Sequence, residues 1–387
     1  MCCTFGRALN IAEKEQRYAM DRKLILERHN RVEKSLRQNG VDAVVLFNVE
    51  GIGWEDLYYF SGFRGTSGIL VFGQNEKFLI TDSRYILQAR EQSPFSVIDK
   101  GDKEDIFLVE SMLRDLGAKT VGINTKTLPS YLYLKLSGLG FTLVDVSDIL
   151  ASCRRKKSKE EVDLIKIASE QASKAFLNVL NDLKPGIKET EVAAKLEYEM
   201  KILGAEGGWG SADFIVASGV RSALPHGRAT SKEWQKGEWA TIDFGARYEG
   251  YVSDITRNIY MGAPSRKAIE IHSILCMAHI KAASKIKPGV AAREVDMTAR
   301  QVLADRGLDK YFTHSLGHGI GLEVHEMPRL SSRSVDVLEE GDVVTVEPGV
   351  YIEGYGGMRV EDDYLVTDSG AQRLTADIPM ELFVVMD

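Results

Sequence analysis

The sequence predicts an α/β (α+β) protein of two domains that follow a short N-terminal tail. Three observations support this prediction: a length of 387 residues, an alternation of helical and short apolar segments up to about residue 150, and an internal repeat in the rest of the chain. A chain of this length usually folds as two or more domains. We expect residues 1–20 to form the tail, residues 21–153 an N-terminal α/β domain, and residues 154–387 a second domain with an internal pseudo-twofold repeat.

The composition excludes several classes of protein. Hydrophobic residues make up 44% of the chain and charged residues 27%, which is ordinary for a globular protein and excludes a fibrous or disordered one. The 49 basic and 56 acidic side chains give a net charge of −7, so we expect no nucleic-acid partner and no anionic membrane partner. No apolar run reaches the ~18 residues that span a bilayer, and the first residues lack the apolar core of a signal peptide. We therefore expect a cytoplasmic protein.

The first domain is predicted from its alternating pattern. A helical pattern covers residues 24–36, and short apolar runs follow at residues 41–47, 68–72 and 77–81. Helices that alternate with short apolar strands are typical of an α/β domain.

A charged segment separates the two domains. In SCRRKKSKEE, residues 152–161, Ser158 and Glu161 have the S-x-x-E spacing of a capping box, in which each side chain bonds to the backbone of the other residue at a helix start. A periodic run at residues 162–183 follows directly. A helix is therefore predicted to begin here, and the domain boundary falls near residues 150–157.

The second domain contains an internal repeat. Lys-Pro-Gly-Ile at residues 184–187 recurs as Lys-Pro-Gly-Val at residues 287–290, and each copy lies between two helical patterns. A longer match aligns KGEWATIDFGARYEGY, residues 236–251, with EGDVVTVEPGVYIEGY, residues 340–355. The two matches keep their order and have offsets of 103 and 104 residues. Such a fixed offset indicates a duplicated unit, here of helices followed by a hairpin.

The repeat pairs acidic residues within segments that are predicted to be strands. Asp243 aligns with Glu347, and Asp254 and Glu361 occupy comparable positions further along each half. A carboxylate that points into a core is costly unless a positive charge neutralises it. Four such groups near a pseudo-twofold axis carry a charge of −4, which two divalent cations would balance. The sequence therefore predicts two divalent metal ions per chain.

Three histidines follow in the segment HSLGHGIGLEVHE: His314, His318 and His325. The glycines around His318 argue against the helix of an HExxH site and for a backbone that approaches another group closely. Carboxylates with one imidazole favour Mn, Co, Fe or Zn over Cu(I), and an oxygen-rich set favours Mn or Co among these. The four cysteines have no CxxC spacing, so we do not expect cysteine to hold the metal.

A family resemblance is evident in five motifs, which are IVASGVRSALPHG, TIDFGARYEGYVSDITR, THSLGHGIGLEVHE, VTVEPGVY and GMRVEDD. Residues 21–387 resemble the pita-bread metallopeptidases of the Xaa-Pro aminopeptidase and prolidase branch, with a creatinase-type N-terminal domain. The resemblance implies a homodimer and two divalent ions per chain, with Mn preferred and Co, Zn or Fe as alternatives. The metal ligands that it implies are Asp243, Asp254, His318, Glu347 and Glu361.

The resemblance also implies roles for the side chains around the metal ions. Glu347 is the candidate for moving a proton towards the leaving nitrogen, since a carboxylate serves first as base and then as acid. His226 and His325 are the candidate catalytic donors to the substrate carbonyl. The candidate substrate-binding residues are His226, His314, His325 and Arg359, although the position of Arg359 fits the anchoring of a ligand carboxylate better.

We therefore expect an aminopeptidase that hydrolyses the N-terminal Xaa-Pro bond of peptides. The alternative is a Xaa-Pro dipeptidase, or prolidase, which would share the metal site and differ only in the walls of the pocket. Three further hypotheses are weaker: a methionine aminopeptidase does not need the N-terminal domain, a creatinase lacks the metal ligands, and a binding module would be expected to have lost them. The remaining histidines, His29, His272 and His279, are expected to be structural.

Overall fold

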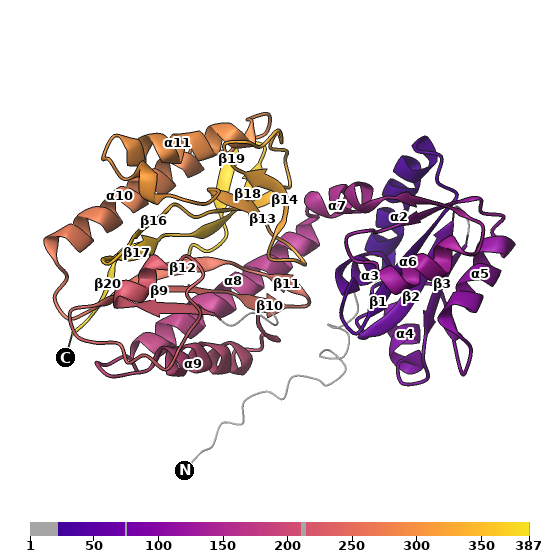
Figure 1. The fold of residues 1–387 in the computed structure, drawn as a ribbon, viewed down its shortest axis with the longest axis horizontal. Helices are drawn as coiled ribbons and strands as arrows, with labels where there is room; N and C mark the ends of the chain where they lie inside the picture. Colours follow the sequence, from indigo (N-terminus) through magenta and orange to yellow (C-terminus); the bar gives the residue numbers. More distant parts are fainter. Residues whose placement is uncertain (1–21, 74–75, 210–213, 387) are drawn as a thin grey trace, which may run out of the picture. The chain divides into compact units, whose positions relative to one another are not determined.

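The computed structural model describes residues 22–73, 76–209 and 214–386, and the predicted tail at residues 1–20 lies outside these ranges. The chain divides into two compact units between Arg154 and Arg155 (Figure 1). Both units combine helices with sheets, which confirms the predicted α/β class.

The first unit is built on a mixed six-stranded sheet of order β4-β3-β2-β1-β5-β6. Its strands are β1 (Ala43–Val49), β2 (Ser67–Gly73), β3 (Lys77–Thr81), β4 (Ser96–Asp99), β5 (Thr120–Ile123) and β6 (Thr142–Asp145). Its helices are α2 (Arg22–Gln38), α3 (Trp54–Ser61), α4 (Ile86–Gln92), α5 (Asp105–Asp115), α6 (Ser130–Ser137) and α7 (Ser147–Arg155). Strand β1 pairs antiparallel with β2 and parallel with β5, and six of its seven residues are buried. Successive residues of a strand point to opposite faces, so burial of consecutive residues shows that both faces are covered, which explains the continuous apolar sequence.

His29 belongs to the core of this unit. Its ring packs edge-on against the rings of Phe60, Phe72 and Phe95, and its Nε2 donates to the Phe60 carbonyl at 2.7 Å. Burial lowers the pKa of His29 to about 3, so the ring is neutral in the folded protein.

The second unit repeats a pair of helices followed by strands. The first half contains α8 (Lys159–Leu180), α9 (Glu189–Ile202), β7 (Gly207–Gly208), β8 (Ile215–Ser218), the 3₁₀ helix η2 (Gly219–Ala223), β9 (Trp239–Phe244), β10 (Ala246–Tyr248), β11 (Tyr251–Val252) and β12 (Ile255–Met261). The second half contains α10 (Arg266–Ala283), α11 (Ala292–Ala304), the 3₁₀ helix η3 (Asp309–Tyr311), β13 (Gly317–Gly319), β14 (Glu326–Leu330), β15 (Val343–Val346), β16 (Gly349–Ile352), β17 (Gly356–Arg359), β18 (Asp362–Thr367), β19 (Gly370–Arg373) and β20 (Phe383–Val385). The capping box at Ser158 and Glu161 forms at the start of α8 as predicted.

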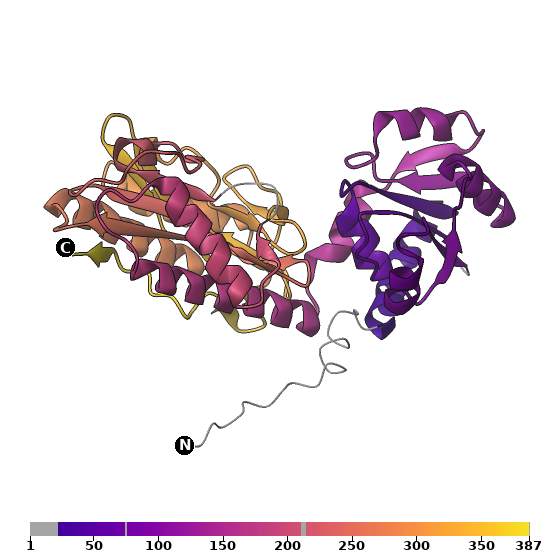
Figure 2. The same ribbon diagram turned by 90° about the horizontal axis from the view of Figure 1, so that it is seen from below.

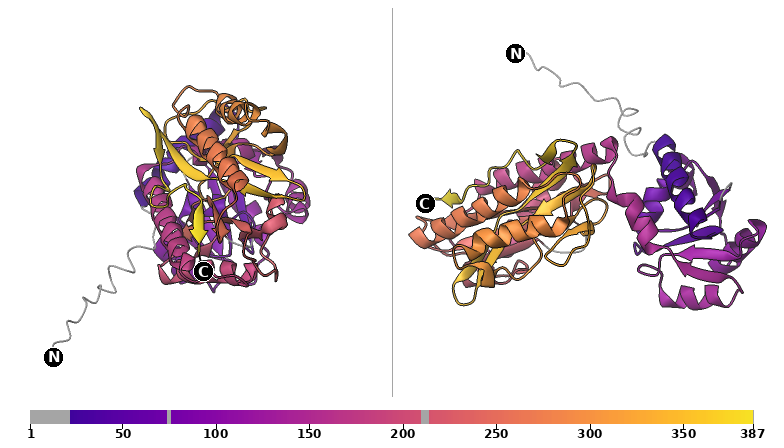
Figure 3. Two further views of the ribbon diagram at one scale, coloured as in Figure 1. Left: turned by 90° about the vertical axis from the view of Figure 1, so that its left-hand side faces the viewer. Right: turned by 90° about the horizontal axis from the view of Figure 1, so that it is seen from above.

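The duplicated helices enclose the strands of this unit. The pair α8 and α9 and the pair α10 and α11 lie on opposite sides of the strands, and each pair faces the viewer in one of the turned views (Figures 2 and 3). The strands form sheets of order β20-β12-β9-β8 and β14-β13-β15-β18-β19, with the smaller sheets β11-β10-β7 and β16-β17. The repeated Lys-Pro-Gly turn joins the helices of each pair, and Gly186 and Gly289 have φ of +88° and +83°. Only glycine adopts this left-handed backbone without strain, which explains the recurrence.

Helix α10 buries the other two structural histidines. His272 is 4% exposed and His279 is fully buried, where its Nε2 lies 2.9 Å from the hydroxyl of Tyr364. Burial lowers the pKa of each histidine to about 4. Within the described parts of the chain, no helix combines the length and the apolarity that crossing a membrane requires.

Arg257 joins the two large sheets of the second unit. It lies on β12, is fully buried, and its Nη2 donates to Oδ1 of Asp362 on β18 at 2.7 Å. Its other N–H groups donate to the carbonyls of Thr256, Glu361, Ile378 and Pro379. A single side chain thus satisfies one carboxylate and four carbonyls.

Replacing Arg257 by leucine should therefore destabilise the protein strongly. The change leaves buried acceptors without a donor and weakens the ion pairing of Asp362, and breaking a buried pair costs about 3–5 kcal/mol. Urea denaturation measures this loss. The control Arg266→Leu, at an exposed position on α10, should change the stability by less than about 0.5 kcal/mol. Equal effects of the two substitutions would contradict this assignment.

Candidate metal centre

Four acidic side chains converge between the two halves of the second unit. Asp243 lies on β9, Asp254 directly precedes β12, Glu347 directly follows β15, and Glu361 lies between β17 and β18. Asp243, Asp254 and Glu361 are 8%, 4% and 2% exposed, and the Glu347 side chain is 15% exposed. The sequence repeat predicted this grouping, and each half contributes two acids.

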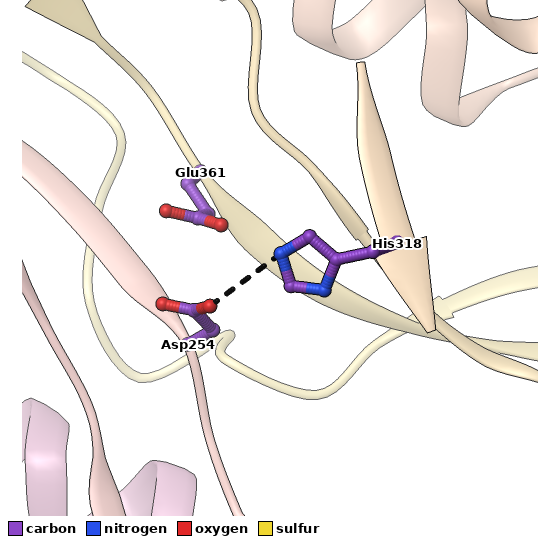
Figure 4. Close-up of side chains that lie close together, drawn as sticks. All are labelled: Asp254, His318 and Glu361. Carbon is purple, nitrogen blue, oxygen red and sulfur yellow. Dashed lines mark ion pairs between the residues drawn. The ribbon is translucent and has the colours of Figure 1, made fainter. Parts of the chain in front are cut away.

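His318 completes the group. One ligand atom from each of Asp254, His318 and Glu361 lies within 4.8 Å of the others (Figure 4). The Nε2 atom of His318 lies 3.8 Å from Oδ2 of Asp254 and 3.4 Å from Oε1 of Glu347. Nδ1 of His318 lies 3.0 Å from the carbonyl oxygen of Gly319. This contact orients the ring so that Nε2 points towards the acids.

Strand pairing around Thr256 explains why these acids meet. Thr256 on β12 is the register partner of Asp243 and also forms an isolated bridge with Glu361. Asp254 precedes Thr256 by two residues, and residues two apart on an extended chain point to the same face. The hydroxyl of Thr256 donates to Oε2 of Glu361 at 2.5 Å and accepts from Nε of Arg359 at 3.0 Å. No pattern in the sequence marks Thr256 as part of the site.

Arg359 is the cation next to the carboxylates. It is 3% exposed, its Nη2 donates to Oδ2 of Asp243, and its Nη1 donates to the hydroxyl of Tyr351 at 2.7 Å. That hydroxyl also lies 3.0 Å from Nε2 of His314. Arg359 therefore connects a carboxylate of the first half to a histidine of the second through Tyr351, which the sequence analysis also missed.

The electrostatics of the cluster fit a divalent cation. Burial raises the pKa of Asp254 and Glu347 well above the usual range, and burial with the nearby charge of Asp243 raises the pKa of Glu361 to about 8. Among the described residues, Oδ1 of Asp243 and Oδ1 of Asp254 have no hydrogen-bond partner. Burial lowers the pKa of His318 to about 3, which leaves the neutral imidazole that binds metal. Buried carboxylates that repel one another and lack donors are suited to bind positive charge.

Glycines allow the strands to approach closely enough to form the cluster. A Cβ atom on Gly317 would lie 2.0 Å from the Thr345 carbonyl oxygen, and one on Gly245 would lie 1.8 Å from the Ser253 carbonyl oxygen. Gly317 directly precedes His318, so a side chain at this position would displace the ligand. This is the close backbone approach that the sequence predicted around His318.

The other predicted histidines lie around the same cavity, which has a volume of about 450 Å³. His226 is exposed on the segment that follows η2, His314 is half-buried, and His325 is exposed with its ring 4.3 Å from that of His318. The segment before His325 is held by Glu326, whose Oε1 accepts from the backbone of Leu322 and Glu323. Its Oε2 accepts from the buried Lys157 at 2.8 Å.

The cavity also contains residues that the sequence analysis did not single out. Arg228 and Arg329 are exposed side chains of its lining, which also includes Trp209 and Ile215. Arg329 follows His325 by four residues, so its proximity to the histidine motif was the one available signal. A further hollow of about 610 Å³ runs along α10 beside His272, and among the described residues its side chains form no cluster of three that could hold a metal ion.

Both units of the chain are similar to known proteins. Residues 163–368 match metallopeptidase family M24, and residues 28–156 match the creatinase/prolidase N-terminal domain. A Xaa-Pro dipeptidase of Pyrococcus horikoshii is 40% identical over 352 residues, which cover 90% of this chain and 97% of the relative. Among solved structures, an X-Pro aminopeptidase from Thermotoga maritima has 40% identity and a TM-score of 0.85, with 91% of this chain and all of that chain covered. A Xaa-Pro dipeptidase from Bacillus anthracis has 37% identity and a TM-score of 0.88, with 93% of this chain and all of that chain covered.

Substitution of Gly317 by alanine should disturb both the fold and the site. The added methyl group meets backbone rather than a flexible side chain, so β13 must move, and overpacking costs about 1–3 kcal/mol. Because His318 moves with it, we also expect weaker Mn²⁺ binding by calorimetry. The control Gly138→Ala has an ordinary φ of −75°, and its Cβ would lie 3.5 Å from the nearest atom, an ordinary contact distance, so it should change neither quantity. Unchanged stability and Mn²⁺ affinity in Gly317→Ala would refute the close-approach argument.

Proposed function

The chain belongs to metallopeptidase family M24, and we propose that it is a Xaa-Pro dipeptidase that uses two divalent metal ions. The observation that carries the proposal is the buried cluster of four carboxylates and one imidazole, which opens into a cavity of about 450 Å³ whose lining includes Arg228, Arg329 and Arg359. The sequence led us to expect an aminopeptidase for longer peptides first and a dipeptidase second. The similarity to proteins named Xaa-Pro dipeptidase favours the second choice, and the similarity to an X-Pro aminopeptidase keeps the first as the alternative.

The residues that would hold the metal ions are Asp243, Asp254, His318, Glu347 and Glu361. Divalent ions in such a site activate a water and polarise the scissile carbonyl. The oxygen-rich ligand set favours Mn over Co, Zn or Fe.

The other side chains have roles that follow from their positions. Glu347 lies in the cavity lining, with its Oε2 at 3.8 Å from Nδ1 of His314. As a carboxylate beside the reacting groups, it would move a proton from the nucleophile to the leaving nitrogen. His226 and His325 can donate hydrogen bonds to the substrate carbonyl as it gains negative charge. Arg359 uses its N–H groups on Asp243, Thr256 and Tyr351, so we assign it to positioning a ligand and not to binding substrate.

Arg329 supports the dipeptide proposal. A dipeptide that ends in proline has its carboxylate next to the scissile bond, and a guanidinium binds a carboxylate through paired hydrogen bonds. Arg329 lies close enough to His318 and His325 for its charge to lower the pKa of both. A prolyl nitrogen has no N–H to donate, so recognition depends on the ring and the carboxylate. A homodimer remains a prediction from the resemblance.

Removal of one ligand carboxylate should abolish activity without weakening the metal-free protein. Asp254→Asn removes a charge that the neighbouring carboxylates repel, so the metal-free variant should be at least as stable as the metal-free wild type. Inductively coupled plasma mass spectrometry should find fewer than two metal ions per chain in Asp254→Asn. A chelator should inactivate the wild type. Glu340→Gln, an exposed control, should retain metal and activity. A wild type that stays fully active without metal would refute the proposal.

Substrates of different length and sequence test the preference for dipeptides and for proline. We expect Xaa-Pro dipeptides to be cleaved with at least about tenfold higher kcat/KM than Xaa-Pro-Xaa tripeptides or Xaa-Ala dipeptides, a difference of about 1.4 kcal/mol. Arg329→Met should lower kcat/KM for Xaa-Pro by about tenfold, mainly through KM, and should not affect Xaa-Pro amides.

The control Arg333→Met, an exposed arginine on the following segment, should have no effect. Faster cleavage of tripeptides would make the protein an aminopeptidase. Equal cleavage of Xaa-Ala would remove the proline assignment altogether.

A further inference from the structure

A buried carboxylate holds both ends of the segment that carries His226. Glu189, the first residue of α9, is fully buried. Its Oε1 accepts from the backbone N–H and the hydroxyl of Ser218, each at 2.8 Å. Its Oε2 accepts from the backbone N–H and the hydroxyl of Thr230, at 3.1 and 2.8 Å. Ser218 and Thr230 flank His226 on its two sides, so one carboxylate closes the loop between them.

Arg221 extends this contact into the loop. Its Nη1 donates to Oε2 of Glu189, and its Nη2 donates to the Arg228 carbonyl at 2.9 Å. Arg228 lies two residues after His226. The carboxylate and the guanidinium therefore fix the backbone on both sides of this histidine.

The second half of the unit contains the same arrangement around His314. Asp296 on α11 is fully buried, and its Oδ1 accepts from the backbone N–H of Leu316 at 3.0 Å. Its Oδ2 accepts from Nε of Arg300 at 2.7 Å. Arg300 in turn donates to the carbonyls of Phe312 and His314, at 3.1 and 2.6 Å. Again a buried acid and its arginine hold the backbone beside a histidine of the cavity.

The two acids do not occupy equivalent positions in the repeat. With the offset of 103 residues, Glu189 aligns with Ala292, and Asp296 aligns with Ala193. The acid of the second half is thus one helical turn further along its helix. Inheritance from one duplicated ancestor does not explain acids at different positions. The need of each histidine segment for a buried acceptor that fixes its backbone explains them better. Neither acid lies in the cavity lining, and their contacts account for the cost of burying the charge.

We propose that Glu189 and Asp296 are positioning residues, with Glu189 setting the position of His226 and Asp296 that of His314. The catalytic consequence rests on the proposed function, in which His226 donates to the substrate carbonyl and His314 lines the substrate cavity. The structural part, that each acid orders one segment and not the other, stands independently of that function.

A double-mutant cycle tests the catalytic part on Xaa-Pro dipeptides with the metal-loaded full-length protein. We expect Glu189→Gln to lower kcat at least tenfold in the wild type and less than twofold in the His226→Ala background, because it acts through that histidine. It should keep its tenfold effect in the His314→Ala background. Asp296→Asn should show the reverse pattern. The exposed controls Glu191→Gln and Glu294→Gln, on the same two helices, should leave kcat unchanged. Equal losses in both histidine backgrounds would overturn the proposal.

Hydrogen exchange measured by mass spectrometry tests the structural part without any activity. Glu189→Gln should accelerate exchange at residues 219–229 at least tenfold and leave residues 312–316 unchanged, and Asp296→Asn should do the opposite. Thr230→Val, which removes one of the contacts of Glu189 at nearly constant volume, should act in the same direction and serves if Glu189→Gln does not fold. Faster exchange throughout the unit would show a general role in folding and overturn the proposal. If the wild type cleaves no Xaa-Pro peptide, the proposed function fails. Hydrogen exchange then decides alone whether Glu189 and Asp296 position their segments.

Discussion

The burial of four carboxylates side by side is the constraint on which the second unit depends. Asp243, Asp254, Glu347 and Glu361 repel one another in surroundings from which water is largely excluded. Burial, together with the neighbouring carboxylates, raises the pKa of Asp254, Glu347 and Glu361. Such an arrangement costs free energy unless the surrounding structure fixes it and positive charge reaches it. The features around it serve this end: Thr256 between two strands, Arg359 on Asp243, and glycines where backbones approach most closely.

The duplication gives this constraint its geometry. Each half supplies a helix pair that covers its strands, and each supplies two of the acids, so neither half alone contains the cluster. Arg257 then connects the two large sheets through Asp362 and backbone carbonyls. Because the ligands lie on or beside paired strands, their positions follow from strand register. His226, His314 and His325 lie instead on segments outside the helices and strands, where separate contacts must fix the backbone.

The sequence predicted the duplication of the second unit and the cluster of acidic residues. The offset of the Lys-Pro-Gly turns indicated the duplication, and acids in apolar strands indicated the metal centre. Thr256, Tyr351 and Glu189 escaped prediction because each acts through partners distant in sequence, and each is a residue type with many ordinary structural roles. The preference for an aminopeptidase over a dipeptidase rested on residues that both activities share. In the proposed function the distinction depends on Arg329 at the cavity wall, and neither the repeat nor the family motifs include this residue.

Arg359 changes the charge balance of the centre. Four carboxylates and two divalent cations are neutral together. The buried guanidinium of Arg359 stays protonated in this environment and adds one positive charge. His318, with its lowered pKa, adds none. A fully loaded centre would therefore have an excess of one positive charge in a region of low dielectric constant, where such an excess acts strongly. Small anions should compete with peptides for this cavity, and the same excess would stabilise the negative charge that develops as an amide carbonyl becomes tetrahedral.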